Sequence, residues 1–343
     1  MPAAIALGTT TFTMSALPGT PAIQNAIPMP FFGTTPFAAP GLGIIAAIVM
    51  FGFGMWWLAR AEARARVTGE GYGLEVPREN AAEDLVVRER ATTASAFDPP
   101  EAIHGRLNDF GPPITLAALP LIIVVAVNLV MSLFVLPRMD ASFLAHEEWG
   151  STSLAAVGGV WAVVTALAAA IVVLIVINYR RLPALRDSMD AGANASVLPV
   201  LSVASLVGFG SVVAALPAFA TVRDWVLGIE GGPLVSLAVA TNVLASLTGS
   251  ASGGLTIALD ALGATYLKIA HEQGIDPGLL HRVAVIGAGT LDTLPHNGAV
   301  VTLLAVCNST HRESYLDIVM VSIVGGLLAL AVVIILGSAV GSF

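Results

Sequence analysis

The chain has 343 residues, of which 56% are hydrophobic and 11% are charged. Soluble domains carry roughly 25% charged residues, so this composition excludes an ordinary water-soluble protein. The formal net charge of −8 argues against a nucleic-acid-binding protein. The mean hydropathy of +0.85 indicates that most of the chain lies in a lipid bilayer. We therefore predict an all-α polytopic membrane protein.

Four apolar stretches are long enough to cross a bilayer, which takes about 20 residues of helix. They are residues 41–59, 114–136, 153–178 and 317–336. The first ends with Trp56 and Trp57, and Trp is enriched where a membrane meets water. We expect each of these stretches to be a transmembrane helix.

Three further apolar stretches are interrupted, at residues 195–221, 233–267 and 279–306. In the first of them, Pro199 and Pro217 flank a central Gly208-Phe209-Gly210. Pro removes a backbone donor and Gly weakens a helix, so we expect a re-entrant hairpin or a broken helix here. At membrane depth, irregular backbone survives only where protein or a water-filled cavity satisfies it.

A polar segment, residues 60–112, separates the first two spans. It is rich in Ala, Glu, Pro and Arg and has no sustained apolar face, which predicts a solvated, partly disordered linker. Arg60, Arg64 and Arg66 follow the first span directly. By the positive-inside rule, this linker is expected to be cytoplasmic.

Two short segments resemble each other at an offset of 277 positions, which is 294 minus 17. Leu17-Pro18 aligns with Leu294-Pro295, and the same offset lays the first span over the last. Duplicated halves are common in transporters, with the substrate between them. The expected parts are the tail of a first repeat, a cytoplasmic linker and a second repeat, at residues 1–59, 60–112 and 113–343. Partners of some second-repeat segments would precede Met1, so we expect the chain to be N-terminally incomplete.

Small and hydroxyl-bearing residues are densest in the stretch at residues 233–267. They are Asn242, Thr248, Gly249, Ser250, Ser252 and Gly253. Unwound helix ends there would offer N–H dipoles and hydroxyls to an anion, which predicts a substrate site. The same residues also fit close packing of membrane helices. Asp260, further along, fits either a coupling carboxylate or a charge at a helix end.

A second polar group lies where Pro295 interrupts an apolar stretch. It contains Asp292, His296 and Asn297. Ionisable residues at membrane depth are expensive and mark functional sites, so Asp292 and His296 are candidates to carry a proton. The alternative is that these charges are solvated at the membrane interface.

A third irregular segment, residues 15–27, is polar without charge, contains Pro18 and Pro21, and is followed by Pro28. It cannot be a regular helix throughout, which suits a hairpin tip that offers Thr20 and Asn25 to a substrate. An ordinary extramembrane loop is the alternative. His281, near the start of the next interrupted stretch, is expected to be solvated.

Three strings carry a family resemblance: FTMSALPGTPAIQN at residues 12–25, GSASGG at 249–254 and DTLPHNGA at 292–299. At these residues the chain resembles the gluconate permease (GntP-type) family of proton symporters, in the branch that includes hydroxybutyrate permeases. The resemblance implies inverted repeats of the ion-transporter type, each with a re-entrant hairpin and a broken helix. It also implies proton-driven uptake of gluconate, 3-hydroxybutyrate or a similar hydroxy acid.

On this resemblance, Ser250 and Ser252 are expected to bind the substrate together with Asn297, and with Asn25 from the other repeat. Asp292 or His296 is expected to carry the proton. The expected partners are a small organic anion, protons and the lipid bilayer of the cytoplasmic (inner) membrane, with a homodimer as the assembly. No cofactor is expected, and no His/Cys cluster has the spacing of metal ligands.

Three alternatives use the same residues differently. An uncoupled carboxylate channel or exchanger would share the substrate site and would not respond to a protonophore. An intramembrane enzyme would use Asp292 and His296 as catalytic groups, but no second carboxylate or nucleophile pairs with them convincingly. A non-transporting, truncated membrane protein would need no site. We expect a transporter and no enzymatic activity.

The linker position provides a first test. Cysteines introduced into residues 60–112 should not react with a membrane-impermeant maleimide added to intact cells, because the positive-inside rule places this loop in the cytoplasm. They should react once the cells are permeabilised. Labelling from outside without permeabilisation would contradict the predicted topology.

Overall fold

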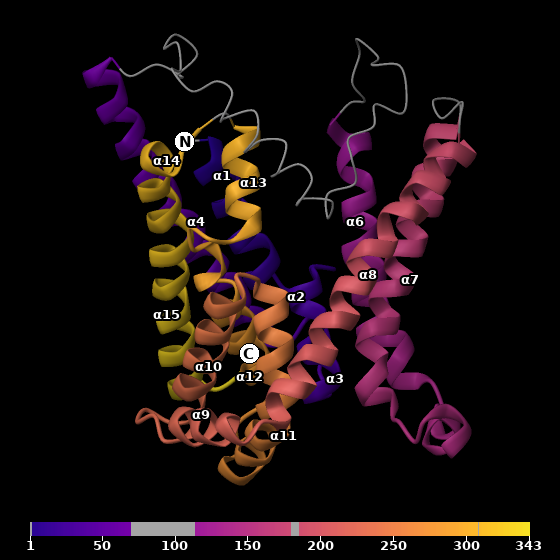
Figure 1. The fold of residues 1–343 in the computed structure, drawn as a ribbon. Coiled ribbons are helices and arrows are strands. Elements are labelled where there is room, and N and C mark those ends of the chain that lie inside the picture. Colours follow the sequence, from indigo (N-terminus) through magenta and orange to yellow (C-terminus); the bar gives the residue numbers. More distant parts are fainter. Residues whose placement is uncertain (1, 70–113, 180–184, 308) are drawn as a thin grey trace.

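The computed structural model describes residues 2–69, 114–179, 185–307 and 309–343, and their regular structure is entirely helical (Figure 1). The first half contains α1 Pro2–Thr10, η1 Thr11–Ala16, α2 Ile23–Ala26, α3 Pro28–Phe32, α4 Pro40–Thr68, α6 Ile114–Val130, η2 Met131–Val135, η3 Leu136–Arg138, η4 Ser142–Ala145, η5 Glu147–Trp149 and α7 Leu154–Asn178. The second half contains α8 Leu185–Ala215, α9 Pro217–Leu227, α10 Pro233–Thr248, α11 Ala251–Gln273, α12 Pro277–Ala288, η7 Leu291–Thr293, α13 Gly298–Val306, α14 His311–Ile318, η8 Val319–Val324 and α15 Gly325–Val340.

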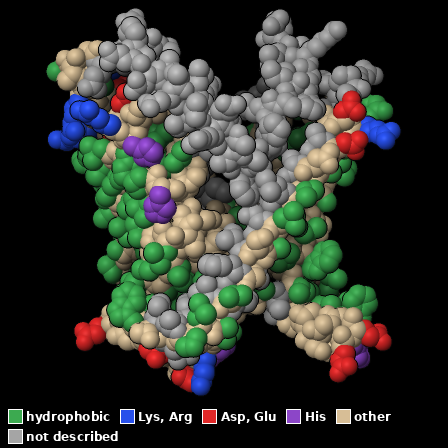
Figure 2. All heavy atoms as spheres, viewed as in Figure 1, with side chains coloured by type: hydrophobic (Ala, Val, Ile, Leu, Met, Phe, Trp, Pro, Cys, Tyr) green, Lys and Arg blue, Asp and Glu red, His purple; other side chains and the backbone are tan. Residues whose placement is uncertain are grey.

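The four predicted spans are confirmed as helices long and apolar enough to cross a membrane. In the described residues these are Pro40–Thr68, Ala118–Arg138, Val157–Asn178 and His311–Val340. The last one passes from α14 through the π-helical η8 into α15. Apolar side chains cover the middle of the molecule and charged side chains gather at its two ends (Figure 2). This distribution matches a bilayer with a polar phase on each side.

The first span is longer than predicted. The helix α4 continues past Ala59 to Thr68, so the first nine residues of the predicted linker, 60–68, are helical. Ala, Glu and Arg are strong helix formers, and Arg66 pairs with Glu62 one turn earlier. Arg60 and Arg64 lie over the rings of the two Trp residues that end the apolar part. The remainder of the linker, residues 70–112, lies outside the described residues.

The hairpin or break predicted around Gly208 is wrong. The helix α8 runs without interruption through Pro199 and Gly208, and the chain leaves the helix only at Leu216. A Cβ at Gly208 would meet nothing within 4 Å, so no neighbouring element requires a bend there. Membrane helices tolerate interior Gly and Pro. Pro217 instead begins α9 after the extended Leu216, as the preference of Pro for the first helical position explains.

The predicted interruption in residues 233–267 is confirmed, and the two helices on either side of it form a hairpin. Helix α10 ends at Gly249, whose φ is +61°, and α11 begins after the extended Ser250. The two helices pack against each other and both lead back toward the same end of the molecule (Figure 1). They cross closely because Gly254 has no side chain: a Cβ there would lie 2.2 Å from the backbone nitrogen of Ala245.

Two broken helices lie beside this hairpin. In one, α1 and η1 are followed by a non-helical stretch and then α2; in the other, α12 is followed by η7, a non-helical stretch and α13. In Figure 1, α1 and α13 lie at one end of the molecule while α3 and α12 lie toward the other, so the two segments run in opposite directions. Leu17-Pro18 and Leu294-Pro295 fall in the two breaks. The division into inverted repeats remains a prediction.

The main core joins the hairpin to the outer spans. Its side chains come from α4, α10, α11, α12 and α15, with Leu42, Leu237, Leu280 and Val333 fully buried. The pair α6 and α7 lies to one side of this core (Figure 1) and contacts it through α3, where Met29 packs against Gly159. The hairpin and the second broken helix are therefore held at the centre of the molecule.

The close crossing in the hairpin gives a second test. Gly254→Ala should lower the free energy of unfolding by about 3 kcal/mol, the upper end of the usual cost of overpacking, because backbone must move to admit the methyl group. Gly52→Ala is the matched control, since a Cβ at this helical position in α4 meets nothing within 4 Å. Thermal unfolding of the two variants in detergent is the measurement. Equal melting temperatures would contradict the crossing.

Candidate functional site

The break in the hairpin faces the break in the second broken helix. A Cβ at Gly249 would lie 3.3 Å from Cδ2 of His296 and 3.7 Å from Cα of Asn297. The His296 Nε2 lies 2.9 Å from the carbonyl oxygen of Ser246, in the last turn of α10. A carbonyl oxygen only accepts hydrogen bonds, so Nε2 carries a proton and donates it. His296 thus satisfies a carbonyl at the end of α10 that has no helical partner.

One face of α10 follows the second broken helix. Asn242, Ser246 and Gly249 recur at the spacing of one helix face. At one end of this face, Gly287 of α12 lies against Thr241 and Asn242. At the other end, Ser246 and Gly249 meet His296, and η7 packs on α10 between them.

Three buried oxygen atoms in this region have no hydrogen-bond partner among the described residues. They are Oδ1 of Asn242, Oδ1 of Asp292 and Oγ1 of Thr293. An unsatisfied buried polar atom is costly, so each needs an explanation. Oδ1 of Asn242 is an acceptor, as is Oδ1 of Asp292 when the carboxylate is ionised, and a hydroxyl group of a ligand would supply a missing donor. A proton on Asp292 would instead remove its buried charge.

The non-helical backbone after η7 is held by three side chains. The side-chain amide of Asn297 donates to the carbonyl oxygen of Asp292. His311 Nε2 lies 3.0 Å from the Pro295 carbonyl oxygen and donates to it. The Tyr315 hydroxyl donates to the backbone carbonyl oxygen of Thr293 at 3.4 Å. These bonds satisfy backbone that a helix would otherwise satisfy. The break is therefore a built feature of the fold.

The predicted hydroxyl residues lie at the tip of the hairpin. Ser250 caps α11, its Oγ accepting from the backbone nitrogen of Gly253 at 3.2 Å, and Ser252 Oγ lies 3.3 Å from Ser250 Oγ. The Thr248 hydroxyl donates back to Leu244. The structure thus brings Thr248, Gly249, Ser250, Ser252 and Gly253 together, and Gly249 brings this tip to His296 and Asn297.

Three predicted site residues lie elsewhere. Asp260 is exposed on α11, beyond the hairpin tip. Asn25 is fully buried, and its amide donates to the carbonyl oxygens of Thr20 and Pro36 at 2.9 and 3.0 Å. Asn25 and the Thr20 carbonyl therefore belong to a separate cluster that holds the first broken helix.

At the centre of that cluster lies Arg282 of α12, which is fully buried. Its guanidinium donates to the carbonyl oxygen of Ala38 through Nε and Nη2, at 3.2 and 2.7 Å, and to Ala16 through Nη1 at 3.2 Å. The carbonyl oxygen of Ser15 lies 3.5 Å from Nη1 and Oδ1 of Asn25 lies 3.4 Å away. The guanidinium thus joins α12 to the end of η1 and to the loop before α4.

His281, expected to be solvated, is instead fully buried in the same cluster. Its Nε2 lies 3.1 Å from Oδ1 of Asn25 and its Nδ1 lies 2.7 Å from Oγ1 of Thr34. Because Asn25 presents an oxygen here, His281 carries its proton on Nε2, and Thr34 donates to Nδ1. His281 was expected to be solvated because it lies near the start of an apolar stretch. The sequence signal for its burial was that His281 and Arg282 are adjacent within that stretch.

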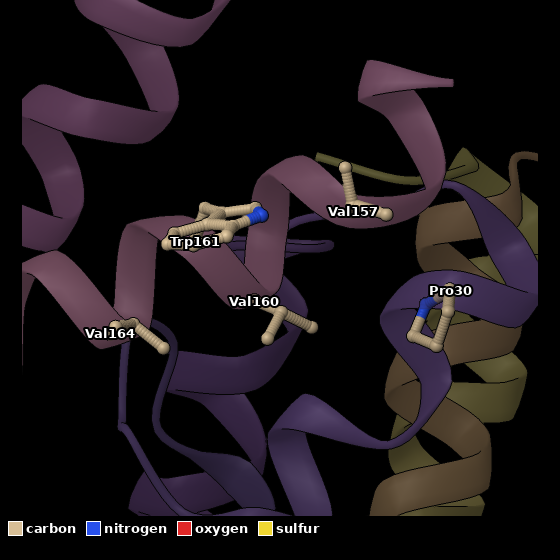
Figure 3. A pocket seen from close by; sticks show the side chains of 5 residues that line it. All are labelled: Pro30, Val157, Val160, Trp161 and Val164. Carbon is tan, nitrogen blue, oxygen red and sulfur yellow. The ribbon is translucent and has the colours of Figure 1, made fainter. Parts of the chain in front are cut away.

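Two cavities in the described part of the chain lie apart from the facing breaks. One, of about 330 Å³, is lined by Pro30 of α3 and by Val157, Val160, Trp161 and Val164 of α7 (Figure 3). Its lining offers no charged group to a hydroxy acid. A second, of about 420 Å³, adjoins the Arg282 cluster and includes Thr34, Ala38 and Gly278.

These features define an α-helical membrane protein in which a helical hairpin meets a broken helix. No family model matches the chain, and no solved structure matches it. The chain is 38% identical over 343 residues to the uncharacterized transporter YxjC of Bacillus subtilis (strain 168), covering 98% of this chain and 69% of that protein. The chain therefore belongs to the family of this transporter, and its homology supports transport in general.

The contact between the breaks gives a third test. Gly249→Ala should cost about 1–2 kcal/mol for a left-handed backbone and should also displace the His296 ring. Gly274→Ala is the matched control: it is also a left-handed helix cap, with φ of +68°, and a Cβ there meets nothing within 4 Å. Both variants should lose similar stability, but only Gly249→Ala should lose transport. Equal transport by the two would separate Gly249 from the site.

Proposed function

We propose that the chain is a secondary active transporter of the cytoplasmic membrane that moves a small organic anion together with a proton. The substrate class is a hydroxy acid such as gluconate or 3-hydroxybutyrate. The observation that carries this proposal is the meeting of two helix breaks at Gly249 and His296. In membrane transporters, irregular backbone of this kind lines substrate sites between repeats.

The site residues suit an anion that also carries a hydroxyl group. The N-terminal end of α11, at Ser250, bears the positive end of the helix dipole. Ser250 and Ser252 provide hydroxyl groups that donate and accept, and the Cα of Asn297 lies 3.7 Å from a Cβ at the neighbouring Gly249. In this proposal the carboxylate and the adjacent hydroxyl group of the substrate both bind at the hairpin tip, at Ser250 and Ser252.

Asp292 is proposed as the coupling group. Its Oδ1 is buried without a partner among the described residues, so a proton on this carboxyl group removes the cost of a buried charge. His296, four residues later, is the second proton carrier considered at this site. Symport requires a group that gains and loses a proton as the site opens to the two sides in turn.

Uncoupled exchange is the competing function, because the same site could bind an anion without a proton. The two are distinguished in proteoliposomes with an imposed pH gradient. Labelled gluconate and 3-hydroxybutyrate are offered to this chain and, in parallel, to the full-length relative YxjC. Proton symport predicts accumulation that a protonophore abolishes; exchange predicts counterflow that a protonophore leaves unchanged. Transport of neither substrate would overturn the proposed substrate class.

The coupling role gives a fourth test. Asp292→Asn should keep counterflow within about threefold of the parent protein and abolish pH-driven accumulation, because the amide keeps the shape but cannot exchange a proton. His296→Ala should weaken substrate binding by roughly tenfold, since the end of α10 loses its donor. Asp260→Asn, on the exposed face of α11, is the control. Full accumulation by Asp292→Asn would show that another group carries the proton.

A further inference from the structure

Arg282 is a buried positive charge whose hydrogen-bond partners among the described residues are all neutral. Its hydrogen-bond acceptors are backbone carbonyl oxygens and the side-chain oxygen of Asn25. Among the residues that the structure describes, no carboxylate lies within ion-pairing distance of it. An ionisable residue at membrane depth that has no opposite charge is a functional candidate by default.

Two of the three carbonyl groups that Arg282 contacts lie at the end of a helix. Ser15 and Ala16 are the last residues of η1, where the chain breaks before Leu17. The C-terminal end of a helix carries roughly half a negative charge, whereas a guanidinium carries a full positive charge. Arg282 therefore reverses the sign of the local charge at this break and does more than neutralise it.

The Arg282 cluster is linked to the facing breaks through close contacts. Ser15 packs directly against Gly289, just after α12, which has no room for a side chain. Gly43 of α4 likewise allows close approach of the Ala16 carbonyl group and Arg282. Arg282 and Gly289 are seven positions apart, so the charge lies roughly 10 Å along α12 from the break at its end.

The end of α10 has its own donor. His296 donates to the Ser246 carbonyl group there, as Arg282 does to the carbonyl groups at the end of η1. Two C-terminal helix ends near the breaks are thus covered by donors, while α11 presents its positive N-terminal end at Ser250. The summed field of these groups favours a negative ligand.

We propose that Arg282 sets the charge preference of the transport site: it makes the site select an anion over a neutral molecule of the same shape, without touching the ligand. This inference rests on the proposed function and adds the residue that determines charge specificity. The separation of about 10 Å reaches only the near end of the second break, at Gly289, so it gives an upper bound: with an effective dielectric constant of about 20, one unit charge at that distance changes the affinity for an anion by at most on the order of tenfold.

The test compares an anion with its neutral amide. Binding of gluconate and of gluconamide, and of 3-hydroxybutyrate and its amide, is measured by calorimetry on the purified full chain in detergent. The wild-type chain should prefer the carboxylate by about tenfold or more. Arg282→Gln, which keeps donors for the carbonyl groups, should lower the preference for the carboxylate over the amide severalfold, up to about tenfold. Arg282→Lys should retain most of this preference. Lys268→Gln, which removes an exposed cation from α11, should change nothing.

A second variant offsets the charge of Arg282 without replacing this residue. Asn25→Asp places a carboxylate beside the guanidinium without removing it, so it should reduce the preference as Arg282→Gln does. Folding of each variant is checked by its melting temperature. A wild-type chain that binds carboxylate and amide equally, or a folded Arg282→Gln that keeps the full preference, would overturn the inference. Failure of the wild-type chain to bind either carboxylate would instead overturn the proposed substrate class, and with it this inference.

Discussion

The fold depends on one constraint: a bilayer interior provides no water for backbone groups that leave a helix, so protein groups must satisfy every break. In the first broken helix Arg282 meets this requirement, because its guanidinium donates hydrogen bonds to the carbonyl groups of Ser15, Ala16 and Ala38. The side-chain amide of Asn25 donates to two further carbonyl groups. In the second broken helix the donors are the side chains of Asn297, His311 and Tyr315, which come from the same half of the chain.

Glycine residues, which have no side chain, are as important to the packing of the helices as the hydrogen bonds are. Gly254 lets the two arms of the hairpin cross at backbone contact, Gly287 admits Thr241, and Gly289 admits Ser15. Because helices in a membrane gain no hydrophobic free energy by leaving lipid for one another, close packing at small residues has to hold them together. The same contacts bring Gly249 and His296 face to face, so the packing that stabilises the bundle also builds the candidate site.

The candidate site was partly predictable. Two patterns predicted helix breaks: the dense hydroxyl and glycine residues at 248–254, and the ionisable residues beside Pro295. Both breaks are present. The break predicted at Gly208 is absent because Gly bends a membrane helix only where a neighbour requires it, and none approaches Gly208. Asn25 was assigned to the substrate because a polar residue in an irregular segment gives no sign of which partners have already occupied it.

The sequence by itself determined the membrane class, the four spans and the approximate positions of the helix interruptions, because length, hydropathy and Pro/Gly placement act locally along the chain. Only the tertiary structure decided which interruptions face each other and which polar groups remain unpaired. The acceptors of Arg282 lie more than two hundred positions away in the chain, at Ala16 and Ala38. Contacts at such separations depend on how the helices pack, and no local pattern of residue types encodes them.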